Sequence, residues 1–207
     1  MQGYAAAVGK GRNCDALIAS GWGFMCLPNR LQAHGQRFAL DNGAWTAHQK
    51  GQRLDELAFY RAVDKVGEQA DFVVLPDVVC GGLESLDMSL ASLEKLADLP
   101  AHKLIAVQDG FTVDQIRPYL CADVGIFLGG STEWKLSTMP LWGSVASRVG
   151  CHYHVGRVNT SKRLRMCAAF GADSFDGSGV SRFGDELPRL DFLARQSDLL
   201  SPRRLAA

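Results

Sequence analysis

Short apolar runs alternate with longer amphipathic stretches along most of this 207-residue chain. Seven runs have the length and the Val, Ile, Leu and Phe content of buried strands: residues 14–20, 37–43, 71–78, 103–110, 124–130, 151–157 and 173–179. Between them, apolar residues recur at helical spacing, which predicts helices over residues 53–68, 84–98 and 160–170. The last of these helices opens with Thr or Ser and closes before Gly171, as capped helices do.

The alternation of strands and helices predicts a parallel α/β fold. Six or seven such units favour a closed barrel over an open sheet, although barrels usually need about 250 residues. We therefore predict a compact (β/α)8 TIM-type barrel that is incomplete or irregular near its N-terminus. Residues 1–207 are expected to form one domain, with a flexible tail over residues 201–207.

The composition limits the classes of function. Hydrophobic residues make up 47% of the chain, and 22 Lys and Arg balance 22 Asp and Glu, so any basic surface for nucleic acid has to be local. No apolar stretch approaches 18 residues, so neither a signal peptide nor a membrane span is predicted. The six cysteines form no CxxC pair and are interpreted as reduced core residues of a cytoplasmic protein. No metal site and no cofactor are predicted.

Polar residues and glycines fall where the predicted strands end, and these positions meet at one mouth if the fold is a barrel. They are Asp41, Asp77, Gln108, Asp109, Gly129, Gly130, Gly156 and Asp176. A single Asp at a strand end is commonly a turn former or a helix cap. Several carboxylates on one rim would repel each other, however, unless a polar ligand with several donors organised them. Purine-like bases offer such donors to Asp and Gln side chains.

Other residues near these ends have two interpretations each. The peptide groups of Gly129 and Gly130 are accessible to a ligand carbonyl, or the pair forms a tight turn. Trp45 is either a stacking plate over a base or a partly buried core residue. Only one of His152 and His154 is expected to face the barrel interior, and His154 is interpreted as a hydrogen-bonded structural residue.

Six segments resemble, in order, motifs of the queuine/archaeosine tRNA-guanine transglycosylases. They are "LDNGAW", "LPDVV", "AVQDG", "FLGG", "YHVGRV" and "GADSFDGSG", between about residues 38 and 182. Members of that family are (β/α) barrels that exchange a guanine for a deazapurine without breaking the sugar–phosphate chain. The resemblance implies that Asp176 is the catalytic nucleophile and that Asp41 is the acid/base carboxylate.

The resemblance also implies a base-binding pocket. Trp45 would stack on one face of the base and Val155, next to Gly156, on the other. Asp77 and Gln108 would read the edge of the base, and the backbone of Gly129 and Gly130 would bind its exocyclic oxygen. Arg157 and Arg182 are predicted to contact phosphates.

The chain lacks the family's zinc site of three clustered cysteines and a histidine, and it is shorter. It most resembles the short phage and bacterial branch associated with deazapurines in DNA, which implies a bacterial or phage-infected cytoplasm. The implied partners are a purine or 7-deazapurine base, DNA that is single-stranded or presented by a partner protein, and a second copy of this chain, but no membrane. Two alternatives stay open: hydrolysis of a nucleoside or nucleotide, and a non-catalytic purine-binding module.

Overall fold

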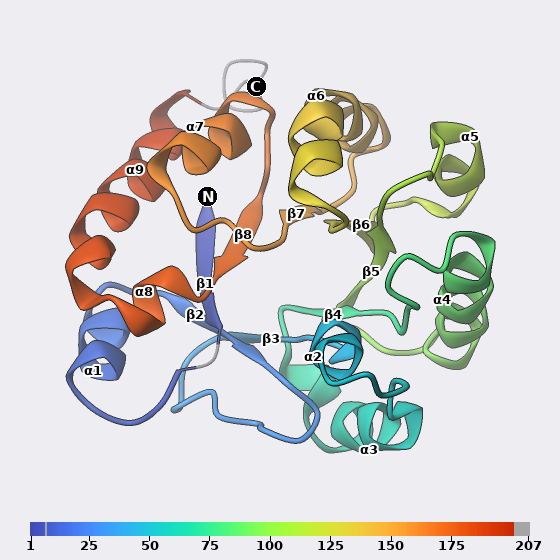
Figure 1. Ribbon diagram of the computed structural model, residues 1–207, viewed down its shortest axis with the longest axis horizontal. Helices are drawn as coiled ribbons and strands as arrows, with labels where there is room; N and C mark the ends of the chain where they lie inside the picture. Colours follow the sequence, from blue (N-terminus) through green and yellow to red (C-terminus); the bar gives the residue numbers. More distant parts are fainter. Residues whose placement is uncertain (7, 201–207) are drawn as a thin grey trace.

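The computed structural model describes residues 1–6 and 8–200 and shows a closed barrel of parallel strands (Figure 1). The strands are β1 (Gln2–Ala6), β2 (Gly23–Cys26), β3 (Phe38–Leu40), β4 (Phe72–Val74), β5 (His102–Val107), β6 (Val124–Leu128), β7 (Tyr153–Val155) and β8 (Ser174–Gly177). Each strand pairs with the next, and β8 pairs with β1, which closes the sheet. The predicted (β/α)8 TIM-type barrel is confirmed. The predicted flexible tail, residues 201–207, lies outside the described residues.

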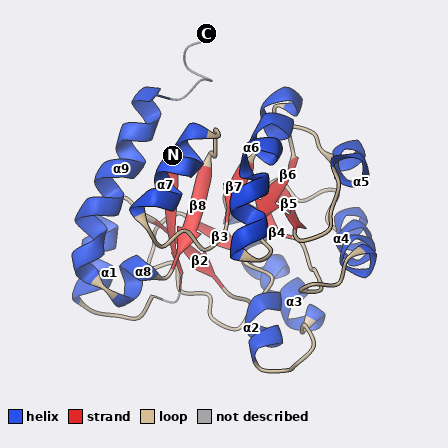
Figure 2. Cartoon of the chain, turned by 45° about the horizontal axis from the view of Figure 1, so that its top comes forward, coloured by secondary structure: helices blue, strands red, loops and turns tan. Residues whose placement is uncertain are grey.

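Helices surround the strands (Figure 2). They are α1 (Arg12–Ala19), α2 (Ala44–Gln49), α3 (Glu56–Val66), α4 (Leu83–Lys95), α5 (Val113–Ile116), α6 (Thr132–Val149), α7 (Ser161–Ala169), α8 (Gly179–Arg182) and α9 (Leu187–Leu200), with 3-10 turns η1 (Gly67–Gln69), η2 (Arg117–Tyr119) and η3 (Gly184–Glu186). Thr160 caps α7 by accepting from the Arg163 backbone N–H at 3.3 Å, as predicted. None of the helices in the described part of the chain has the length and apolar character to cross a membrane.

The N-terminal part of the barrel differs from the prediction. Residues 14–20, predicted as a strand, lie largely in α1, and the strands β1 and β2 were not predicted. The reason is local: Cys14 and Leu17 are buried three positions apart on one helix face, which is helical spacing within a short apolar run. The two missed strands are only five and four residues long, and Gly3, Ala5 and Ala6 lower the hydrophobicity of β1. The barrel is therefore complete at its N-terminus.

Two apolar layers hold the barrel together. Side chains that alternate along each strand point either inward or toward the helices. The inward layer comprises Tyr4, Met25, Ala39, Phe72, Val74, Leu104 and Ala106. The outward layer packs under the helices and includes Val73, Ile105, Ile126, Tyr153, Val155 and Phe175.

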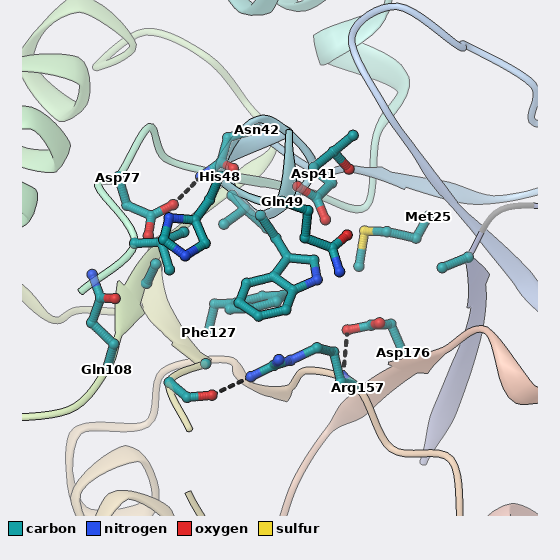
Figure 3. A pocket seen from close by; sticks show the side chains of 18 of the residues that line it. Met25, Asp41, Asn42, His48, Gln49, Asp77, Gln108, Phe127, Arg157 and Asp176 are labelled. Carbon is teal, nitrogen blue, oxygen red and sulfur yellow. Dashed lines mark hydrogen bonds between the residues drawn. The ribbon is translucent and has the colours of Figure 1, made fainter. Parts of the chain in front are cut away.

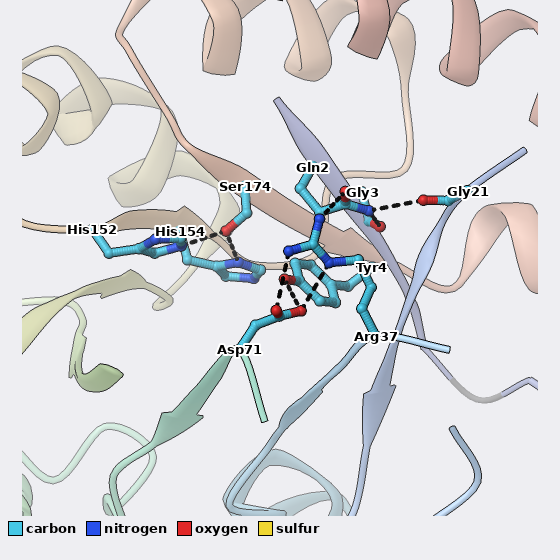
Figure 4. Close-up of polar contacts among 9 residues, drawn as sticks. All are labelled: Gln2, Gly3, Tyr4, Gly21, Arg37, Asp71, His152, His154 and Ser174. Carbon is cyan, nitrogen blue, oxygen red and sulfur yellow. Dashed lines mark hydrogen bonds and ion pairs between the residues drawn. The ribbon is translucent and has the colours of Figure 1, made fainter. Parts of the chain in front are cut away.

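The amino end of the barrel is closed by a polar cluster (Figure 4). The Tyr4 hydroxyl donates to Asp71 Oδ2 at 2.7 Å, and the Arg37 guanidinium donates to both Asp71 oxygens at 3.0 Å. Because Asp71 directly precedes β4, these contacts lie at the end of the barrel where the strands begin. The space for a ligand is therefore at the opposite end.

Gly143 lies in the middle of α6, and a Cβ added there would overlap the Phe170 carbonyl oxygen at the end of α7. We expect Gly143→Ala to lower the free energy of unfolding by about 1–3 kcal/mol, although Ala has the better helix propensity. In a domain of this size, each kcal/mol lowers Tm by about 2–4 °C. Thermal unfolding followed by circular dichroism measures the change. The matched control is Ser144→Ala, because Ser144 is exposed on the same helix; an equal or higher Tm for Gly143→Ala would contradict the close approach of α6 and α7.

Candidate active site

A cavity of about 600 Å³ opens at the carboxyl end of the barrel strands (Figure 3). Its size is typical of pockets for small ligands. Active sites of (β/α)8 barrels lie at this end, which is built from the loops that follow the strands. The cavity is therefore the candidate active site.

Most of the predicted site residues come together in this cavity. Those that line it are Asp41, Trp45, Asp77, Gln108, Gly129, Gly130, Arg157, Asp176 and Arg182. Val155 and Gly156 are not among the lining residues. Val155 is fully buried in the outward layer, because its neighbour His154 faces the interior and successive strand residues point to opposite sides. The apolar ring that lines this part of the cavity is Phe127, which the sequence did not single out.

The two oxygens of the Asp176 carboxyl group have different surroundings. Oδ1 accepts from His154 Nε2 at 3.1 Å and from the Arg157 backbone N–H at 3.2 Å. Oδ2 receives no hydrogen bond from the residues that the structure describes, although Asp176 is only 7% exposed. One oxygen is thus held by the protein, while the other is available to a ligand.

Asp41 and Asp77 bind their protons more tightly than ordinary carboxyl groups. Burial raises the pKa of Asp41 to about 6; a hydrogen bond from the Gly43 N–H at 2.8 Å opposes this shift, and the charge of Asp176 adds to it. Burial also raises the pKa of Asp77 to about 7, against the hydrogen bond from Asn42 Nδ2 at 2.7 Å and with a contribution from Asp41. The mutual repulsion of the three carboxylates is therefore relieved by protons near neutral pH.

Asn42 fixes the position of Asp77, and the sequence did not identify it. Its Nδ2 donates to the Leu75 carbonyl at 2.6 Å and to Asp77 Oδ1, and its Oδ1 accepts from the Ala44 N–H at 2.8 Å. These contacts tie the start of α2 to the end of β4. The available signal was an Asn placed just before a helix, where such residues satisfy free N–H groups.

The Gln108 amide is occupied by the loop that follows β4. Its Oε1 accepts from the Cys80 N–H at 2.8 Å, and its Nε2 donates to the Val78 carbonyl and to Ser85 Oγ, both at 2.8 Å. Both N–H donors are therefore used within the protein. Gln108 lies in the predicted place but holds a loop of the cavity wall.

The glycine pair forms a tight turn at the end of β6. Gly130 has φ +73°, and a Cβ there would overlap Asp109 Oδ2. Asp109 in turn accepts from both the backbone N–H and the hydroxyl of Ser131 at 2.6 Å, so it organises the start of α6 and is not among the lining residues. The requirement for glycine at position 130 is therefore steric and conformational.

Arg157 lies across the cavity mouth. Its guanidinium carbon is 4.3 Å from the centroid of the Trp45 ring, and Nη2 donates to the Gly130 carbonyl. Trp45 is 42% exposed and lines the cavity. It therefore belongs to the cavity wall and is not a core residue. A cation over an indole face is an attractive contact that a flat ligand would have to replace.

Lys135 is a buried amine close to this site that the sequence did not indicate. It is 1% exposed on α6, and its Nζ donates to the Gly156 carbonyl. Burial lowers the pKa of Lys135 to about 8, and the charge of Arg157 contributes, while Asp176 opposes the shift. Lys135 thus fixes the turn that presents the Arg157 N–H to Asp176.

The prediction that only one of His152 and His154 faces the interior is wrong. His152 Nε2 and His154 Nδ1 both contact Ser174 Oγ, at 2.7 and 2.8 Å, and both rings lie against Phe72. His152 directly precedes β7, and residues two positions apart along extended backbone share a face. The interpretation of His154 as a hydrogen-bonded buried residue is confirmed.

Within residues 1–6 and 8–200, no group of three or more His, Cys, Asp or Glu side chains is placed to hold a metal ion. No protein-family model and no curated protein matches the sequence. Among solved structures, the chain is similar to the phosphodiesterase PaMucR bound to c-di-GMP, with 11% identity, TM-score 0.43, and coverage of 72% of this chain and 62% of that chain. It is also similar to tryptophan synthase from M. tuberculosis, with 18% identity, TM-score 0.48, and coverage of 91% and 68%. The chain therefore spans less than two thirds of the phosphodiesterase, and these distant matches assign no family.

The raised pKa of Asp77 predicts a pH-dependent stability effect. Its carboxyl group has a pKa of about 7 when folded but about 3.9 when unfolded, so above pH 7 the folded state carries the cost of a buried charge. We expect Asp77→Asn to raise the free energy of unfolding at pH 8 by at most about 4 kcal/mol, and by progressively less as the pH falls toward 4. Urea unfolding at pH 5 and pH 8 measures this. The exposed Asp64→Asn serves as the control. An equal increase in the free energy of unfolding at both pH values would contradict the raised pKa of Asp77.

Proposed function

We propose that this protein is a transglycosylase that exchanges a guanine-type base for a 7-deazapurine at an N-glycosidic bond in DNA, through a covalent intermediate between Asp176 and the sugar. The proposal is carried by the three carboxyl groups of one cavity. Asp176 has one oxygen held by N–H donors and one available, whereas Asp41 and Asp77 retain protons up to near-neutral pH. Carboxyl groups in different environments divide acid and nucleophile roles.

In the first step, Asp176 Oδ2 attacks C1′ of the sugar. The C1′–Oδ2 bond forms and the C1′–N bond breaks, and the base leaves with the electron pair and takes a proton from Asp41. The incoming base then gives a proton to the Asp41 carboxylate while its nitrogen attacks C1′ and displaces Asp176. Two displacements at the same carbon retain the configuration.

The walls of the cavity suit a flat base with a polar edge. Trp45 and Phe127 supply ring surfaces, and we assign to Phe127 the apolar contact that the resemblance placed on Val155. A protonated Asp77 both donates and accepts, which matches the alternating donors and acceptors of a purine edge. The backbone N–H of Gly130 would bind an exocyclic oxygen. The Gly129 N–H does not share this role, because it donates to the Val107 carbonyl at 2.8 Å. Gln108 acts indirectly, by holding the loop at Cys80.

DNA is proposed as the substrate because of two positively charged side chains in the cavity and because of the resemblance to the transglycosylases. Arg157 and Arg182 line the cavity, where they would contact the phosphates beside the reacting nucleotide. A base inside a duplex cannot reach a cavity of this kind without being extruded, so single-stranded DNA or DNA opened by a partner protein is the proposed form. Homodimer formation rests on the resemblance alone.

Exchange by the purified protein is tested with a guanine-containing single-stranded deoxyoligonucleotide and radiolabelled guanine. We expect label to enter the oligonucleotide, and Asp176→Asn to reduce the rate by about 1,000-fold or more while guanine binding, measured by calorimetry, is retained. Asp64→Asn is the matched acid-to-amide control, because Asp64 is exposed on α3 and does not line the cavity. Undiminished exchange by Asp176→Asn would overturn the proposal, and guanine release without incorporation would identify a hydrolase instead.

The role of Asp41 predicts the pH dependence of the first step. Asp41 must be protonated to supply the leaving base, and the protonated fraction falls tenfold per pH unit above its pKa of about 6. We therefore expect single-turnover guanine release to decrease above about pH 6. Asp41→Asn should be slower and lose this decrease. A wild-type profile that rises through this range would assign the acid role to another group.

A further inference from the structure

A chain of three hydrogen bonds runs through the barrel interior to the proposed nucleophile. His152 Nε2 contacts Ser174 Oγ at 2.7 Å, Ser174 Oγ contacts His154 Nδ1 at 2.8 Å, and His154 Nε2 contacts Asp176 Oδ1 at 3.1 Å. Figure 4 shows the first two of these contacts. The barrel register creates the chain, because His154 on β7 is paired with Ser174 on β8, and Asp176 follows two residues later on the same face.

His154 does not reach the cavity itself. It is 0% exposed, and the Phe127 ring stacks on it with centroids 5.0 Å apart and an interplanar angle of 17°. Phe127 lines the cavity, whereas His154 does not. Any effect of His154 on a ligand must therefore be transmitted through Asp176 or Phe127.

The ionised carboxylate fixes the direction of the whole chain. A carboxylate only accepts, so His154 Nε2 must carry a proton. Burial lowers the pKa of His154, although Asp176 opposes this, and the ring stays neutral with a lone pair on Nδ1. Nδ1 then accepts from the Ser174 hydroxyl, whose oxygen accepts from His152 Nε2–H. The reverse direction would place a ring lone pair against the carboxylate.

We propose that His154 is a positioning residue that holds Asp176 Oδ1 and thereby aims Oδ2 at the reacting carbon, with Ser174 and His152 setting the tautomer of His154. This inference rests on the proposed function of Asp176. When Oδ2 bonds to C1′, Oδ1 becomes the carbonyl oxygen of the ester and still accepts from the same N–H. The contact therefore persists from the free carboxylate to the covalent intermediate, without a proton having to move along the chain.

Kinetics on three variants test the positioning role. His154→Leu removes the donor, His154→Gln places an amide N–H near the position of Nε2, and Ser174→Ala removes the contact to Nδ1. We expect His154→Leu to lower the rate constant of single-turnover guanine release by about 10- to 100-fold, because a hydrogen bond to a charged group is lost. The KM for the oligonucleotide in steady-state exchange should be unchanged. His154→Gln should recover most of the rate. The rate of Ser174→Ala should lie between those of His154→Leu and His154→Gln. Equal rates for His154→Leu and His154→Gln would overturn the inference. Rate losses that are explained by a lower Tm of each variant would also overturn it.

Nitrogen-15 NMR of the histidine rings tests the same chain without substrate. At pH 7, we expect two-bond nitrogen–proton correlations to show a neutral His154 with its proton on Nε2 in the unsubstituted protein. A proton on Nδ1, or a charged ring, would overturn the inference even where Asp176→Asn is inactive and the proposed function holds. Full guanine release by Asp176→Asn, or no release by the unsubstituted protein, would instead overturn the proposed function and remove the role of His154, whatever the tautomer.

Discussion

The burial of three carboxyl groups in one cavity is the constraint on which the rest of this site depends. Closing the barrel brings Asp41, Asp77 and Asp176 together from β3, β4 and β8, although more than a hundred residues separate the first from the last. Three buried negative charges would repel each other strongly. The protein reduces the repulsion by raising two of the pKa values and by holding one oxygen of the third carboxylate with two N–H donors.

The polar groups beneath the cavity are arranged to keep these carboxyls in place. Asn42 joins the start of α2 to Asp77, Gln108 holds the loop after β4, and Lys135 holds the turn before Arg157. Each is buried, and each uses its hydrogen-bonding capacity on the protein, as buried polar groups must. These contacts favour a fixed arrangement of the carboxyl groups, which the proposed attack of one carboxylate oxygen on a single carbon atom would require.

Much of the architecture was visible in the sequence, and the errors have physical causes. Six of the seven predicted strands overlap strands of the barrel, because runs such as residues 103–110 include consecutive apolar residues, here 104–107. Residues 14–20 were misassigned because a short apolar run suits a strand or a helix equally. Val155 was placed in the cavity and Phe127 overlooked, because apolar character marks a residue as buried but does not say toward which side of the sheet it points.

The alternation of strands and helices and the polar residues at strand ends could be read from the sequence, since both depend on residue types at fixed local spacing. How those residues are used depends on contacts between distant parts of the chain. Whether Gln108 faces a ligand or a loop, and whether His154 reaches Asp176, depends on the register between strands and on contacts across 20 or more positions. Those contacts form when the barrel closes, so no local pattern encodes them.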